Sequence, residues 1–459
     1  MSRWSPLNSL NQPQPRNRQK LGNDQRIVNT VMIHLFTGAL AAGASLANAQ
    51  LTAAPAPTAA VPTAAPVATP TPTPTPVTPA AVVPAIPPTW AQGRTAEQAN
   101  SNLTPHPPGL IALPVDEIQT TKLKAPPGFK VELWASGLPN ARSMTVGSKG
   151  TVFFGTRFPG NVYAVVDNGK TRQTRVIAKG LHRPNGVAFK DGALYVAELS
   201  RILRYDNIES QLDNPPAPVV VFDALPKDEP HGWKFMTFGP DGKLYFQIGT
   251  PANAVVPPAT HAVIMQLDLE TKTMRTIASG VRNSVGMDFH PVTKELWFTN
   301  NGRDWVTDDL PNDTLHHVSR KGMNFGYPFC HQGDLLDPDF GKGRTCDEFD
   351  KPDMLLGPHV AALGMRFYTG KMFPAAYKNS IFIAEHGSWN RTKKTGYIVS
   401  RVVLDKNGKA VSKEPFLTGF ANGEDFWGRP ADVQVMPDGA LLVSDDVAGA
   451  VFRVSYAGK

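Results

Sequence analysis

Cysteine is nearly absent from this chain, which limits the redox chemistry and metal chemistry that the chain can support. Only two cysteines, Cys330 and Cys346, occur among 459 residues, and no Cys-X-X-Cys-His motif is present. Covalently attached c-type haem is therefore not supported. In an exported protein, a lone pair of cysteines at this spacing favours a disulfide over a metal site.

The chain also lacks a large positive net charge once residues 1–49 are left out of the count. The formal net charge of the whole chain is +7, but residues 1–49 carry five basic residues and one acidic residue, which leaves +3 for the rest. So small an excess does not indicate a nucleic-acid partner, and we predict none.

Residues 1–49 have the pattern of an export signal, in which basic residues precede an apolar run and a small-residue cleavage site. The apolar run extends from Val31 to Leu46 and is followed by Ala47-Asn48-Ala49. An uncleaved membrane anchor is the alternative, although the run is short and weakly apolar for a membrane span. We predict a periplasmic or secreted protein that contacts a membrane only if the leader is retained.

Residues 50–109 are predicted to be a low-complexity linker. Ala, Pro and Thr recur from about residue 52 to 91, including one Thr-Pro-Thr-Pro-Thr-Pro run, and this composition cannot form a packed core. Such a segment is typical of a stiff, extended tether. Ordered structure is expected from residue 110, so 110–459 is assigned to one folded catalytic domain.

The rest of the chain repeats one pattern six times, in which a short apolar strand, a turn and a second apolar strand follow one another. The clearest copy is 231–249, where Gly-Pro-Asp-Gly joins two strands and Asp241, like Asp438 in a later copy, is expected to form the turn. The predicted second strands are 151–155, 193–197, 244–248, 295–299, 380–384 and 440–444. One such unit cannot bury both faces, so the pattern favours an all-β, six-bladed β-propeller.

Two further features follow from this assignment. Strand 129–134 is expected to pair with 451–456, which would close the ring and remove its exposed edges. The cysteines fall in an insertion that we place between the fourth and fifth units. His316, His317 and His331 belong to that insertion and are expected to lie on the surface.

The repeat alignment predicts a site, because the segments that lead into the innermost strands of a propeller meet near its axis. These segments contribute Arg142, His182, Arg183, His231, Arg282, Asn283, His359 and Arg429. A ring of arginines and histidines suits an anionic ligand, although any one of them could instead form a structural ion pair with a neighbouring blade. The loops that follow the second strands return to the same face, and their oxygens could hold a hard cation such as Ca²⁺.

With these motifs in this order, the chain resembles the soluble glucose/sorbosone dehydrogenase family, which depends on pyrroloquinoline quinone (PQQ), and in particular its sorbosone dehydrogenase-like branch. The resemblance covers roughly residues 125 to 457. It is carried by His231 with the following Gly-Pro-Asp-Gly-Lys-Leu-Tyr, and by segments 280–287, 301–304, 321–328 and 385–391. It implies a six-bladed propeller that binds PQQ together with Ca²⁺.

The resemblance also implies roles for single residues. His231 would be the general base, and Arg282, with Asn283 beside it, would stabilise negative charge on the reduced cofactor. Arg429 and Arg391 would pair with cofactor carboxylates.

Other positions concern the metal and the substrate. Main-chain oxygens of Gly302 and Arg303 match the family's metal-binding loop. The Asp that orients the catalytic histidine in glucose dehydrogenases corresponds to Thr250 here, and Ala431 stands where a second clamping Arg is expected. Glucose is therefore not assigned as the substrate.

The expected function is that of an exported quinoprotein dehydrogenase. It would oxidise an aldose or a sugar-derived aldehyde by hydride transfer and pass electrons to an external quinone or cytochrome. A Ca²⁺-dependent lactonase or esterase and a non-catalytic binding module remain alternatives, since the fold alone does not separate them.

Overall fold

The computed structural model describes residues 89–96 and 98–458. The predicted export signal and the linker up to residue 88 lie outside these residues. Within them, no helix is long and apolar enough to cross a membrane. The helices of the described chain are short 3₁₀ turns: η1 (Thr89–Ala91), η2 (Val115–Glu117), η3 (Thr120–Lys122), η4 (Ile208–Ser210), η5 (Cys346–Glu348) and η6 (Ala375–Tyr377).

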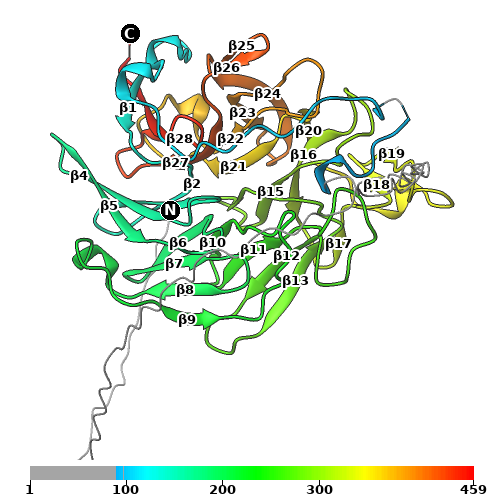
Figure 1. The fold of residues 1–459 in the computed structure, drawn as a ribbon, viewed down its shortest axis with the longest axis horizontal. Coiled ribbons are helices and arrows are strands. Elements are labelled where there is room, and N and C mark those ends of the chain that lie inside the picture. The colour runs from blue at the N-terminus through cyan, green and yellow to red at the C-terminus, as the bar shows by residue number, and fades with distance from the viewer. Residues whose placement is uncertain (1–88, 97, 459) are drawn as a thin grey trace, which may run out of the picture. The chain divides into compact units, whose positions relative to one another are not determined.

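Six sheets of four or five strands form the blades of a propeller, which confirms the predicted fold (Figure 1). Blade 1 comprises β2 (Ala141–Val146), β3 (Val152–Thr156), β4 (Val162–Asp167) and β5 (Arg172–Ala178). Blade 2 comprises β6 (Gly186–Lys190), β7 (Ala193–Ala197), β8 (Ile202–Tyr205) and β9 (Val219–Phe222). Blade 3 comprises β10 (Met236–Phe238), β11 (Leu244–Ile248), β12 (Val263–Leu267), β13 (Met274–Ser279) and the added β17 (Met323–Asn324).

The remaining three blades complete the ring. Blade 4 comprises β14 (Met287–Phe289), β15 (Leu296–Asn300), β16 (Asn312–Val318) and β20 (Met354–Pro358). Blade 5 comprises β21 (Ala362–Phe367), β22 (Ile381–Glu385), β23 (Ile398–Leu404) and β24 (Ala410–Leu417). Blade 6 comprises β27 (Pro430–Val435), β28 (Leu441–Asp445), β29 (Ala450–Tyr456) and β1 (Phe129–Ala135). Two small hairpins, β18 (Cys330–His331) with β19 (Leu335–Leu336) and β25 (Ala421–Asn422) with β26 (Asp425–Phe426), lie outside the blades.

The predicted second strands correspond to β3, β7, β11, β15, β22 and β28, with each boundary within one residue of the prediction. In the hairpin of β10 and β11, Gly242 turns the chain with φ +75°, a value that favours glycine. The Asp241 and Asp438 carboxylates accept bonds from the main-chain nitrogens of Lys243 (3.1 Å) and Ala440 (3.0 Å). Both aspartates are therefore the turn formers that the sequence predicts.

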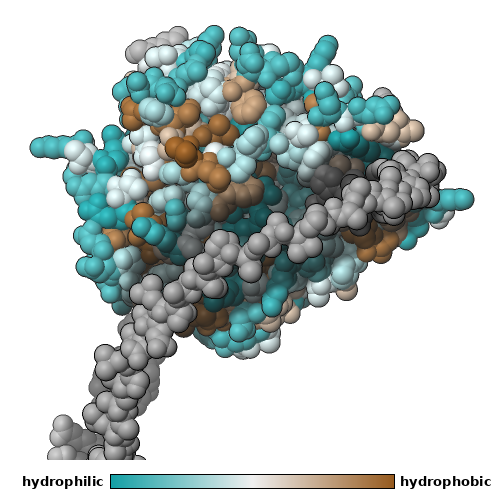
Figure 2. All heavy atoms as spheres, in the orientation of Figure 1, coloured by the Kyte–Doolittle hydropathy of each residue, from teal (hydrophilic) through white to brown (hydrophobic). Residues whose placement is uncertain are grey.

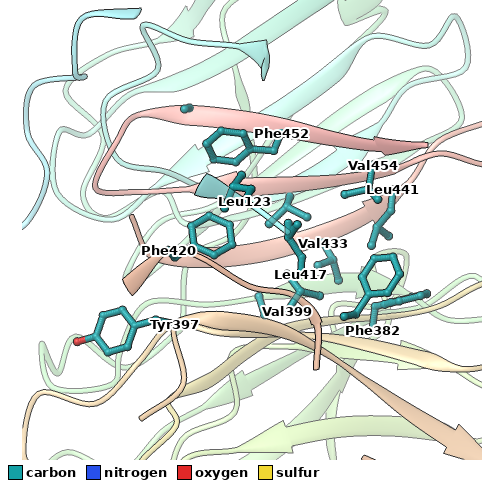
Figure 3. Packing of buried hydrophobic residues seen from close by; sticks show 14 of the residues in the cluster. Leu123, Phe382, Tyr397, Val399, Leu417, Phe420, Val433, Leu441, Phe452 and Val454 are labelled. Carbon is teal, nitrogen blue, oxygen red and sulfur yellow. The ribbon is translucent and has the colours of Figure 1, made fainter. Parts of the chain in front are cut away.

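Closure of the ring joins the first strand to the last blade. β1 pairs antiparallel with β29, and Phe129 lies opposite Tyr456, as predicted. Figure 3 shows the apolar packing between blades 5 and 6, where Phe382, Val433 and Phe452 are fully buried. Burial of each large apolar side chain contributes about 1.5–3 kcal/mol to the stability of the fold. The blades are therefore a stable scaffold for the loops that connect their strands. Hydrophilic side chains predominate on the face drawn in Figure 2, which agrees with a core between the blades.

The long insertion lies inside blade 4, between β16 and β20, and not between blades 4 and 5 as predicted. The fourth strand of blade 4 follows the insertion in sequence, and the insertion also adds β17 to the edge of blade 3. The predicted disulfide between Cys330 and Cys346 is confirmed, with a Cα–Cα distance of 5.5 Å. It closes the insertion on itself.

The prediction that three histidines lie on the surface is wrong for two of them. His316 and His317 belong to β16 itself, so their side chains alternate between its two faces. His316 is buried and stacks against Phe298, whereas His317 is partly exposed. His331 is also buried, and its Nε2 bonds to the buried Asp337 carboxylate at 2.7 Å.

The part of the predicted linker that the structure describes contacts the propeller. We name residues 89–96 and 98–109 the strap. In Figure 1 it is the blue-to-cyan ribbon drawn across the blades that carry β20 and β23. The boundary predicted at residue 110 therefore does not mark the first residues that contact the blades.

Candidate active site

One pocket of about 440 Å³ collects residues from every blade. Of the predicted ring, Arg142, Arg183, His231, Arg282, Asn283, His359 and Arg429 line this pocket. Gly302, from the predicted metal loop, lines it too. The rotational arrangement inferred from the repeats thus brings together residues that are almost 300 positions apart in the sequence.

His231 is the residue whose chemistry the geometry defines most clearly. It stands before β10 with φ +51°, and its Nδ1 lies 3.0 Å from the main-chain oxygen of Thr250. A carbonyl oxygen only accepts, so Nδ1 carries the proton and Nε2 keeps its lone pair. Burial, followed by the nearby Arg282 cation, lowers the pKa of His231 well below its ordinary value of 6.5. His231 is therefore a neutral imidazole with one nitrogen free to accept a proton.

The main-chain carbonyl of Thr250 takes the place of the absent orienting carboxylate. Thr250 itself is held in place, since its Oγ1 lies 3.0 Å from the hydroxyl of Tyr327. Gly249 allows the close approach, because a Cβ at this position would lie 2.6 Å from the Cβ of His231. Sequence comparison of side-chain types could not reveal this partner, since the atom belongs to the backbone.

Arg282 lies beside His231 in a fixed orientation. Its Nε donates to the main-chain oxygen of Asn253, and its Nη2 donates to Asn253 Oδ1, both at 2.9 Å. Nη2 also pairs with Asp304 Oδ2 at 2.8 Å. A guanidinium with this many fixed contacts presents its remaining edge in one direction, which suits recognition of a planar anionic ligand.

Blade 6 contributes Arg429 to the pocket lining, with Asp446 behind it in the same cluster of charged groups. Arg429 donates to the main-chain oxygens of His386 (2.9 Å) and Gly387 (2.7 Å). Asp446 accepts from His386 Nε2 at 2.7 Å and pairs with Arg142. Although burial raises the pKa of Asp446, His386 and Arg142 lower it more, so this carboxylate remains charged.

Arg157 is a pocket residue that the sequence prediction missed. It follows β3, and its guanidinium lies 3.5 Å from the ring centroid of Trp233. Within the described part of the chain it forms no ion pair, and its Nε is buried without a hydrogen-bond partner. Burial and the neighbouring Arg142 and Arg183 lower its pKa. Arg157 lies in the loop that follows the second strand of blade 1, and alignment of the repeats at this loop would have identified it.

Three residues predicted for the site do not line the pocket, although the prediction for Arg303 concerns its main-chain oxygen and not its side chain. Arg391 does not line the pocket; it donates to Asp308 O at 3.0 Å and pairs with Asp309 at 2.6 Å. The Arg303 side chain is buried in ion pairs with Asp337 and Asp339, both at 2.6 Å. His182 also lies outside the pocket lining and bonds to Glu229 at 2.6 Å.

A metal site built from side chains is not evident in residues 89–96 and 98–458, where no three His, Cys, Asp or Glu side chains are grouped to hold an ion. Gly302 is held by a bond from its nitrogen to Asp313 Oδ1 at 2.8 Å. Calcium at the predicted loop would therefore depend on main-chain oxygens.

The pocket contains more cationic than anionic side chains. Five arginines line it, namely Arg142, Arg157, Arg183, Arg282 and Arg429, against the three acids Glu229, Asp304 and Asp313. The class that the fold and the site define is a six-bladed propeller whose pocket offers positive charge to an anionic ligand beside a histidine that can accept a proton.

The chain belongs to the TrAA12-like family, whose model matches residues 123–457. This confirms at family level the resemblance to soluble PQQ-dependent sugar dehydrogenases. The chain is 33% identical over 360 residues to an uncharacterized protein of Borreliella burgdorferi, which covers 75% of this chain and 94% of that one. It is 26% identical over 234 residues to the PQQ-dependent pyranose dehydrogenase of Coprinopsis cinerea, covering 39% of this chain and 31% of that enzyme.

Solved structures share the fold. A Trichoderma reesei enzyme of carbohydrate-active family AA12, in an iodide structure, has a TM-score of 0.64 at 21% identity, covering 73% of this chain and 97% of that one. The holo form of the PQQ domain of the Coprinopsis cinerea pyranose dehydrogenase has a TM-score of 0.62 at 18% identity, covering 72% of this chain and 97% of that one.

Proposed function

We propose that this protein is a PQQ-dependent oxidoreductase that oxidises an aldose or a sugar-derived aldehyde, with PQQ and Ca²⁺ as its cofactors. The observation that supports it best is the neutral His231, with Nε2 free, beside the fixed guanidinium of Arg282 in an arginine-rich pocket. The named relative in Coprinopsis cinerea is a PQQ-dependent sugar dehydrogenase, which agrees with this chemistry.

The residues of the pocket fit PQQ, which carries three carboxylates. Among the described residues, Asn283 Oδ1 and Trp233 Nε1 are buried without hydrogen-bond partners, and both residues line the pocket. Buried polar groups in native proteins are normally paired, so these atoms indicate a missing polar ligand. Arg157, Arg282 and Arg429 would hold the carboxylates and carbonyls of the cofactor.

Bound in this pocket, PQQ would supply the acceptor for a hydride from the substrate carbon. His231 Nε2 accepts the proton of the substrate hydroxyl, which for an aldehyde is a hydroxyl of its hydrate. The Thr250 oxygen holds the imidazole in the tautomer that allows this transfer. Arg282 supplies hydrogen-bond donors that are already oriented where negative charge develops.

The location and the electron acceptor are parts of the same proposal. The N-terminal sequence pattern and the disulfide support export, and an external quinone or cytochrome would receive the electrons. The test is dye reduction by purified protein supplied with PQQ and Ca²⁺, across a panel of aldoses and sugar aldehydes. Hydrolysis of sugar lactones without PQQ would instead support the lactonase alternative.

Binding of PQQ is expected to depend on Arg157, which the sequence comparison did not identify. A hydrogen bond to a charged group contributes about 1.5–3 kcal/mol, so Arg157→Met is expected to raise the dissociation constant of PQQ by about 10- to 100-fold. Absorbance titration measures this constant. The matched control is Arg175→Met, since Arg175 pairs with the exposed Asp213 and lies outside the pocket lining. An unchanged constant in Arg157→Met would remove this residue from the cofactor site.

The pH dependence follows from the lowered pKa of His231. The neutral form is the active base, and a pKa below 6.5 keeps His231 neutral at pH 6.5 and somewhat lower. We therefore expect kcat/KM to be level through neutral pH and to fall only as the pH drops below 6.5. Initial rates across pH measure it, and an acidic limb with its midpoint above 6.5 would be inconsistent with this base.

A further inference from the structure

The strap is attached to the propeller at its N-terminal end by three hydrogen bonds to its backbone. The main-chain oxygens of residues 90, 92 and 93 accept from Trp305 Nε1 (2.6 Å), Asn253 Nδ2 (3.0 Å) and Arg303 Nη2 (3.1 Å). Asn253 also orients Arg282, and Arg303 belongs to the predicted metal loop. This end of the strap is therefore joined to the residues that frame the cofactor site.

The C-terminal end of the strap is attached to blades 5 and 6. His106 Nε2 lies 3.0 Å from the hydroxyl of Tyr397, and its ring lies 4.6 Å from that of Phe426. Gly109 packs so closely that a Cβ there would lie 2.5 Å from the main-chain oxygen of Asp446. The strap is thus held to the propeller at both ends.

At both of these attachments the strap forms part of the pocket wall. Trp90, Pro105 and His106 line the pocket. The Trp90 ring meets that of Trp389 at a centroid distance of 6.1 Å and an angle of 87°. Both residues are partly exposed, so together they form an aromatic corner at right angles, backed by Arg94 over the Trp90 ring and by Trp305 against the Trp389 ring. The apolar faces of a pyranose ring pack well against such indole surfaces.

This wall does not come from the propeller repeats. The family match covers residues 123–457, and the strap precedes it. Trp389 belongs to the matched region, whereas Trp90 is supplied by the N-terminal extension. The extension therefore adds a surface to a pocket that the blades alone would leave more open.

We propose that the strap is a specificity-determining wall, in which Trp90 and Trp389 form a subsite for one pyranose ring and exclude longer saccharides. The proposal deepens the proposed function and rests on it for the identity of the substrate class. Trp90 contacts the substrate without taking part in proton transfer.

The test is calorimetric binding of glucose and maltotriose to the full chain loaded with PQQ and Ca²⁺. The wild type is expected to prefer the monosaccharide. In Trp90→Ala the ratio of the two dissociation constants is expected to shift toward the trisaccharide by about tenfold or more, since truncating an aromatic contact residue at a binding site commonly costs that much. Trp90→Phe, which keeps an aromatic face, is expected to restore most of the preference. Ile111→Ala is the control, because Ile111 is 83% exposed and lies outside the pocket lining.

The results of this binding experiment distinguish failure of the subsite from failure of the proposed dehydrogenase function. An unchanged ratio in Trp90→Ala, or a wild type that binds neither sugar, would overturn the subsite. The shifted ratio with rescue by Phe supports it. If the sugars bind with the expected ratios but no dye is reduced, the subsite holds and the proposed dehydrogenase function fails.

Discussion

Replacing His231 by Ala is expected to lower kcat by about 10²- to 10⁴-fold, the usual contribution of a positioned general base. The neutral imidazole is held by the Thr250 oxygen at 3.0 Å, and Ala leaves no group to accept the substrate proton. The dissociation constant of PQQ should change little, because the arginines that would hold it remain.

The experiment measures steady-state dye reduction and PQQ binding on the same preparation. His182→Ala is the matched control, since His182 is exposed and lies outside the pocket lining. It should react at close to the wild-type rate. A His231→Ala protein that keeps wild-type turnover would rule out the assigned base.

Replacing Asp337 by Ala is expected to lower the free energy of unfolding by about 3–5 kcal/mol, because it leaves buried partners unpaired. Asp337 is buried and bonds to Arg303 and His331, and its carboxylate also accepts from two main-chain nitrogens, those of Asp339 (2.8 Å) and Phe340 (2.9 Å). Loss of this group would loosen Arg303 and with it the loop beside Gly302.

Denaturant unfolding followed by fluorescence measures the effect. Asp339→Ala is the control, since this carboxylate pairs with the same Arg303 but its side chain is 60% exposed. Exposed ion pairs contribute about 0–1 kcal/mol, so the control should unfold near the wild type. Equal losses in the two variants would show that burial of Asp337 does not decide the effect.

The blades could be predicted from sequence because each one repeats the same alternation of apolar residues and the same turn chemistry. That local pattern placed β7 and β11 at their observed bounds. The convergence of His231, Arg282 and Arg429 followed from symmetry alone, since equivalent positions in a closed ring face a common axis.

Features without a repeated signal were predicted less well. The insertion separates β16 from β20, so the fourth strand of blade 4 was not recognised and the insertion was placed between blades. His316 and His331 were expected on the surface because they were assigned to the insertion, which has no counterpart in the repeat, although both are buried. The strap was not recognised because it was included in the predicted linker 50–109, although Trp90, Arg94 and His106 differ from the Ala, Pro and Thr of the preceding residues.

The most direct test of the proposed function is anaerobic mixing of PQQ- and Ca²⁺-loaded protein with aldoses and sugar aldehydes, followed by absorbance of the bound cofactor. We predict that at least one of these substrates reduces the bound cofactor in a single turnover, and that His231→Ala slows this step. Bound cofactor that stays oxidised with every sugar and aldehyde of the panel would contradict the proposed function.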